Sequence, residues 1–116
     1  TITRERVTEE TAPAQFLQPE HPLLKEPNAL GPADFEGWVQ ERGLYFAGEW
    51  HERYDTPLGW NDAGEPLRKG GLLVAKHGQG AFMYTGISFF RELPAGVPGA
   101  YRLLANMLSY KPDDNE

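Results

Sequence analysis

The residues best suited to chemistry lie close together, in the stretch from position 49 to position 52. Glu49 and His51 alternate, so on a strand their side chains would share one face, and Glu52 follows directly. A carboxylate beside an imidazole suits acid–base work or shared metal ligation. The alternative is a polar strand end that faces water. His21 and His77 stand at no metal-ligand spacing. We therefore assign no catalytic residue, no metal and no cofactor from the sequence.

The same part of the chain is rich in aromatic rings, between positions 38 and 60. Exposed rings stack on the apolar faces of sugars, and neighbouring polar groups bond to the hydroxyls. One hypothesis is thus a carbohydrate-binding surface; its candidate residues are Trp50, Tyr54, Trp60, Glu49, His51 and Glu52. The alternative, which the pattern alone favours, is that most of these rings form the core.

Composition excludes several classes of function. The chain has 116 residues and a formal net charge of −6, and its Lys and Arg are scattered rather than gathered in a stripe. Nucleic acid and anionic membrane surfaces are therefore not expected as partners. The absence of cysteine excludes disulfides, thiolate zinc sites and a cysteine nucleophile. Gly78-Gln79-Gly80 lacks the third glycine of a dinucleotide loop, because position 83 is Met.

Two elements are predicted with clear boundaries. The apolar runs 72–75 and 81–84 flank a Gly-Gln-Gly turn and predict a central hairpin at about 71–87. Neither run alternates with polar residues, which indicates strands covered on both faces. Pro98 opens a helix to about residue 109. Its predicted buried stripe is Val97, Tyr101, Leu104 and Leu108, widened by Ala100, Leu103 and Met107. The fold class is α/β or α+β, with a small mixed or antiparallel sheet.

The chain reads as one domain over residues 1–110, with a disordered tail at 111–116. One long helix is too little to cover both faces of the hairpin, so an apolar face or open sheet edge should remain. We expect a partner there, either the neighbouring domain of a parent protein or a second copy in a homodimer. No apolar run is long enough for a membrane span.

Three stretches, 34–46, 70–80 and 93–106, carry a family resemblance. Their sequences resemble the C-terminal region of large bacterial PIG-L family (LmbE-like) deacetylases. The three stretches begin with Asp34-Phe35-Glu36-Gly37-Trp38, Gly70-Gly71-Leu72-Leu73-Val74 and Leu93-Pro94-Ala95-Gly96-Val97. The resemblance covers roughly residues 6–110. That region is similar to the last hairpin and helix of class I glutamine-amidotransferase-like domains, whose active members use a cysteine that this chain lacks.

The resemblance implies an accessory role beside a zinc-dependent N-acetylglucosaminide deacetylase domain. The family's metal motif is His-Pro-Asp-Asp, and the nearest string here, Lys111-Pro112-Asp113-Asp114, has Lys in place of the first ligand. No ligand is therefore carried over. The implied function is a non-catalytic binding module of a carbohydrate-active enzyme, and a secreted or periplasmic bacterial location is compatible with it. A small hydrolase using Glu49, His51 and Glu52, and a purely structural interdomain module, remain alternatives.

Overall fold

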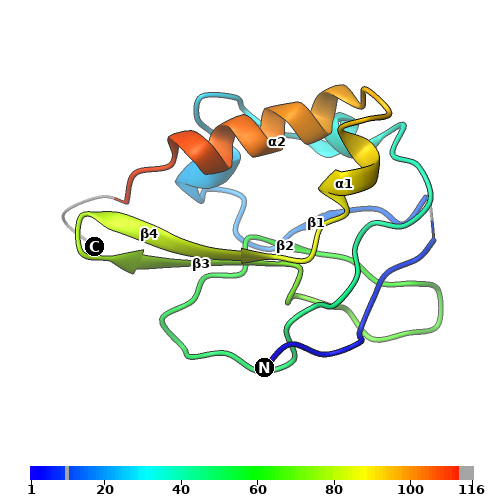
Figure 1. Cartoon of the computed structure of the whole chain (residues 1–116), viewed down its shortest axis with the longest axis horizontal. Coiled ribbons are helices and arrows are strands. Elements are labelled where there is room, and N and C mark those ends of the chain that lie inside the picture. The colour runs from blue at the N-terminus through cyan, green and yellow to red at the C-terminus, as the bar shows by residue number, and fades with distance from the viewer. Residues whose placement is uncertain (10, 113–116) are drawn as a thin grey trace.

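The computed structural model describes residues 1–9 and 11–112, which form an α+β fold. Within these residues, two antiparallel sheets of two strands each, β1–β2 and β3–β4, combine with short helices (Figure 1). In chain order the elements are β1 (Gln15–Phe16), the 3-10 helices η1 (Pro22–Leu24) and η2 (Pro32–Phe35), β2 (Leu58–Gly59), β3 (Leu72–His77), β4 (Gly80–Thr85), α1 (Phe89–Glu92) and α2 (Pro98–Ser109).

The predicted hairpin is confirmed as β3 and β4. The two strands pair antiparallel, from Leu72 opposite Thr85 to His77 opposite Gly80. Gly78 takes a φ of 59° at the turn, a left-handed conformation that glycine adopts without strain. The flanking apolar runs and the glycine turn thus fix both the pairing and its register, as the sequence indicated.

The two faces of the hairpin have different surroundings. Directly opposed residues share a face, so Leu72 and Val74 lie on one side and the opposed pair Ala75 and Phe82 on the other. Leu72 and Val74 are buried in the main core, whereas Phe82 is 56% exposed. The prediction of strands covered on both faces is therefore wrong for β4. The reason is that an irregular segment, residues 48–56, covers the second face incompletely.

The predicted helix is confirmed as α2, but the predicted buried stripe is wrong. Val97 is buried, yet Tyr101 is 51% exposed and Leu108 is 80% exposed, and Leu104 is half-buried. The residues that α2 buries are Gly99, Ala100, Leu103 and Asn106. Ala100 and Leu103 were predicted to widen the buried stripe, whereas Asn106 was expected to lie off it.

Close packing against η2 explains why α2 buries a different side from the predicted one. At position 99 a Cβ atom would overlap the carbonyl oxygen of Asp34, so only glycine allows α2 to approach so closely. The nearest elements to α2 are η2 and η1. Gly99 and Ala100 therefore face the protein together with Leu103, whereas Tyr101 and Leu108 face outward.

The core is built around aromatic rings that pack in edge-on and tilted geometries. Phe35 packs against Phe16, Trp38 and Trp60, at ring-centroid distances of 5.9, 5.4 and 5.8 Å. Trp60 also contacts Phe46, and both rings are fully buried. Burial of such rings contributes much of the hydrophobic free energy in a domain of this size.

No larger sheet forms among the described residues. The aromatic stretch 44–50 approaches neighbouring segments through an isolated bridge, Ile2 to Ala47, beside the bridge of Gly43 to Ile87. Tyr45 has a φ of 54°, which interrupts the extended backbone that a strand needs. Of the tail predicted at 111–116, positions 113–116 lie outside the described residues, and Pro112 is buried.

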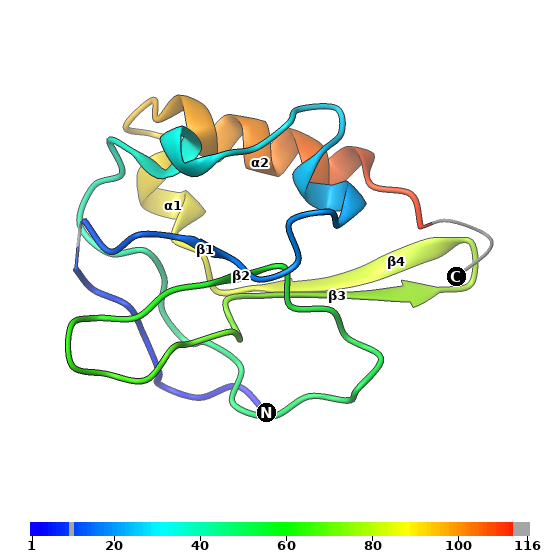
Figure 2. The same cartoon turned by 180° about the vertical axis from the view of Figure 1, so that it is seen from behind.

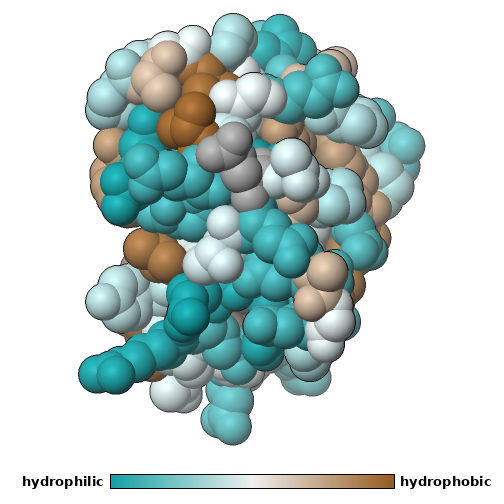
Figure 3. Space-filling model, turned by 90° about the vertical axis from the view of Figure 1, so that its right-hand side faces the viewer, coloured by the Kyte–Doolittle hydropathy of each residue, from teal (hydrophilic) through white to brown (hydrophobic). Residues whose placement is uncertain are grey.

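Seen from either side, α2 lies on one side of the hairpin and the segment 48–56 on the other (Figures 1 and 2). The face at the α1 end of the molecule is mostly hydrophilic, with hydrophobic side chains in small separate groups (Figure 3). In the described part of the chain, every helix is too short or too polar to cross a membrane.

Candidate ligand-binding site

A turn in the segment 48–56 faces the outer side of the hairpin. The backbone N–H of Tyr54 donates to the carbonyl of His51 at 3.0 Å and closes the turn. Asp55 then exchanges two backbone hydrogen bonds with Val74, of 2.6 and 3.1 Å, which fasten the end of the turn to β3. These bonds hold the turn beside the face of the hairpin that lies opposite α2.

An open hollow of about 410 Å³ lies between this turn and the hairpin. We call it the hairpin hollow; it is lined by His51, Arg53, Tyr54, Ala75, Lys76, His77 and Phe82. Tyr54 and Phe82 meet edge to face, with ring centroids 6.3 Å apart and planes at 78°. This is a favourable aromatic geometry, and it leaves more than half of Phe82 exposed to solvent.

The polar lining of the hairpin hollow has one sign of charge. Among the described residues, its ionisable side chains besides Tyr54 are two histidines, Arg53 and Lys76, and none of these lining residues carries a carboxylate. The whole chain, in contrast, carries 17 acidic and 11 basic residues. Asp55 follows Tyr54 in the sequence, but its carboxylate lies 3.0 Å from the Nε2 atom of His21, outside the hollow.

The turn also fixes the tautomer of His51. Its Nδ1 atom accepts a hydrogen bond from the backbone N–H of Arg53 at 3.1 Å. The neutral ring must then carry its proton on Nε2. His51 is exposed, so it presents a hydrogen-bond donor rather than a proton acceptor to a ligand. This arrangement suits binding of an oxygen atom better than general-base catalysis.

The structure separates the six residues singled out in the sequence. Tyr54 and His51 line the hairpin hollow. Trp60 is fully buried in the core, so its ring is closed to a ligand and its place in the candidate surface is a wrong prediction. Trp50 is half-buried, and it does not line the hollow.

The two remaining candidates, Glu49 and Glu52, are exposed and lie outside the lining of the hollow. Among the described residues, no three His, Asp or Glu side chains come together as metal ligands would. Sequence reasoning missed Phe82, which was expected to be covered. The signal for it was available: Phe82 stands opposite Ala75, a small residue that leaves room on that face.

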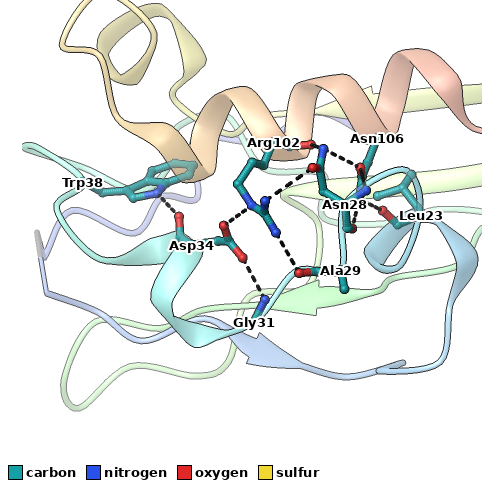
Figure 4. Close-up of polar contacts among 8 residues, drawn as sticks. All are labelled: Leu23, Asn28, Ala29, Gly31, Asp34, Trp38, Arg102 and Asn106. Carbon is teal, nitrogen blue, oxygen red and sulfur yellow. Dashed lines mark hydrogen bonds and ion pairs between the residues drawn. The ribbon is translucent and has the colours of Figure 1, made fainter.

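A second polar cluster joins α2 to the loop before η2 (Figure 4). Arg102 binds Asp34 through Nε at 2.6 Å and donates to the carbonyl of Ala29 at 2.9 Å. Asn106, fully buried, accepts from the N–H of Asn28 at 2.9 Å and donates to the carbonyl of Leu23 at 2.8 Å. These groups are occupied by one another, so the cluster is structural.

A third cluster surrounds Glu92, which is fully buried on α1. Its carboxylate accepts a hydrogen bond from the N–H of Val39 at 2.7 Å and lies 3.3 Å from the hydroxyl of Ser88. Burial raises the pKa of Glu92, and these hydrogen bonds together with nearby Arg42 offset part of that rise. Ser88 is itself fully buried, so it is not placed as a nucleophile. The cluster fastens the loop containing Val39 to α1.

Comparison of the chain with protein families, curated proteins and solved structures found no match. Functional inference therefore depends on the geometry described above.

Proposed function

We propose that this chain is a non-catalytic carbohydrate-binding module and that the hairpin hollow is its ligand site. The observation that carries the proposal is the contact of half-buried Tyr54 with the exposed ring of Phe82, beside side-chain hydrogen-bond donors. A sugar ring has an apolar C–H face that packs on an aromatic ring, while its hydroxyls accept hydrogen bonds from groups such as Arg53 and His51. Both features meet in one hollow of suitable size for a small ligand.

The wider proposal is an accessory role in a PIG-L-type N-acetylglucosaminide deacetylase, where the module would hold the polymer near the catalytic domain. The resemblance over residues 6–110 supports this part. The hydrolase alternative gains no support, because Glu49 and Glu52 lie outside the hollow. The accessory module also needs a surface for its neighbour.

The outer face of α2 supplies that surface. Tyr101, Leu104 and Leu108 stand three and four positions apart and leave an apolar strip on the exposed side of the helix. We propose that a neighbouring domain covers it, and a second copy of the chain is the alternative. Light scattering over a range of concentrations separates the two, since a constant monomer mass excludes the homodimer.

Calorimetric titration with an oligosaccharide panel tests the binding site. Phe82→Ala and Tyr54→Ala should each weaken binding by roughly 1–2 kcal/mol, or about five- to thirtyfold, because each removes one wall of the ring pair. Phe90→Ala is the matched control: Phe90 is 61% exposed and belongs to α1, away from the hollow. Unchanged binding by Phe82→Ala would refute the site. Absence of glycan binding by a folded wild type would favour the purely structural module.

A further inference from the structure

The lining of the hairpin hollow specifies the charge of its ligand. Among the described residues that line it, Arg53 carries a positive charge, His51 supplies the hydrogen-bond donor Nε2–H, and no carboxylate is present. This composition is unusual in a chain of net charge −6. If charged residues were distributed at random over the surface, acidic residues would be expected here, because they outnumber the basic ones.

The carboxylates of the segment 48–56 lie outside the lining of the hollow. Asp55 is engaged by His21 at 3.0 Å and lines a separate hollow with it. Glu49 and Glu52, the other acidic residues of the 48–56 segment, are not in the lining. None of the ion pairs found within the described residues includes Arg53. Its guanidinium is therefore not neutralised by a carboxylate of the described residues and suits two-point contact with an oxyanion.

We infer that the ligand of the hairpin hollow is an anionic sugar, one whose ring carries a carboxylate or a sulfate. This inference rests on the proposed function, since it names the class of carbohydrate that the site takes. The sugar ring would pack against Phe82 and Tyr54, while Arg53 and the Nε2–H of His51 would bind its anionic oxygens. The same lining repels a cationic sugar such as glucosamine.

A series of oligosaccharides built on related rings tests the charge directly. The probes are glucosamine oligomers, N-acetylglucosamine oligomers and hyaluronan oligosaccharides of equal length, which are cationic, neutral and anionic. Affinity should rise in that order, with hyaluronan at least about tenfold tighter than the neutral oligomer at about 0.05 M salt. The difference should shrink at about 0.5 M salt, where charges are strongly screened. Heparin oligosaccharides form a separate arm that distinguishes sulfate from carboxylate.

Two variants separate the charge from the ring stacking. Arg53→Gln should weaken binding of the anionic oligosaccharide about tenfold and leave the neutral oligomer unchanged, whereas Phe82→Ala should weaken both. Arg4→Gln, at an exposed arginine outside the hollow, is the matched control. Equal or tighter binding of the neutral or cationic oligomer would overturn the inference and leave the proposed function standing. Failure of every oligosaccharide to bind would overturn both.

Discussion

Asn106 should contribute more to stability than any hydrophobicity pattern would indicate. Its amide sits fully buried on the inner face of α2 and forms hydrogen bonds with the backbone of Leu23 and Asn28 (Figure 4). The Asn106→Ala variant would leave one backbone N–H and two carbonyls of this loop without a partner. The Leu23 carbonyl is buried and the Asn28 groups are partly buried, so the folded state gives them restricted access to water and their loss of a partner is costly.

The size of the effect follows from the number of bonds lost. Three hydrogen bonds of 2.8 to 2.9 Å to backbone groups disappear. At about 1 kcal/mol each, with a further penalty for buried groups left unsatisfied, Asn106→Ala should lower the free energy of unfolding by about 3–5 kcal/mol. In a chain of this length that corresponds to a fall in Tm of more than about 10 °C.

Urea denaturation followed by circular dichroism measures this change, with Ser109→Ala as the control. Ser109 is exposed on the same helix, so its replacement should change stability by less than about 0.5 kcal/mol. Asn106→Asp provides a second test: the ionised side chain accepts from Asn28 but cannot donate to two carbonyls, so the variant should regain stability in acid. A loss below about 1 kcal/mol for Asn106→Ala would refute the network.

Three further predictions concern packing and titration. Leu103→Ala, at a fully buried position, should cost about 2–5 kcal/mol in chemical denaturation, while Leu108→Ala should cost less than about 0.5 kcal/mol; equal losses would mean that α2 is rotated. Because burial raises the pKa of Glu92, the carboxylate destabilises the fold as pH rises above the ordinary glutamate range. The free energy of unfolding of Glu92→Gln should therefore rise relative to that of wild type as pH increases above the ordinary glutamate range. A difference that does not change with pH would contradict this. Burial alone would raise the pKa of Asp62, but hydrogen bonds from the Glu9 and Thr8 N–H groups and the Thr8 hydroxyl, with the charge of Arg6, lower it overall. Asp62→Ala should be most destabilising at neutral pH and should approach wild type as pH falls through the lowered pKa in acid-denaturation curves.

The parts of the fold set by local chemistry were predictable from the sequence. The glycine turn at Gly78 and the proline at the start of α2 mark the hairpin and the helix, since both act through backbone conformation alone. The direction in which α2 faces was not predictable. Its inner side is marked by Gly99 and Asn106, whereas hydrophobicity points to Leu108.

The candidate site was likewise predictable only in part from the sequence. Local composition correctly drew attention to the stretch around His51 and Tyr54, both of which line the hollow. It could not tell that the ring of Trp60 is enclosed by Phe35 and Phe46, because ring burial depends on distant parts of the chain. Phe82 was missed for a different reason: the apolar composition of β4 does not show which face stays open, and the small Ala75 opposite Phe82 is a signal only once the register is known.

The way distant segments bond to one another has a consequence for how the protein forms during synthesis. Ile2 bridges to Ala47, β1 pairs with β2, and Asn28 depends on Asn106 near the far end of the chain. Few of these contacts are local, so the entropy of closing long loops must be overcome before most of them are made. In the nascent chain, the bonds of Leu23 and Asn28 to Asn106 can accordingly form only after α2 has left the ribosome, so the fold is completed late.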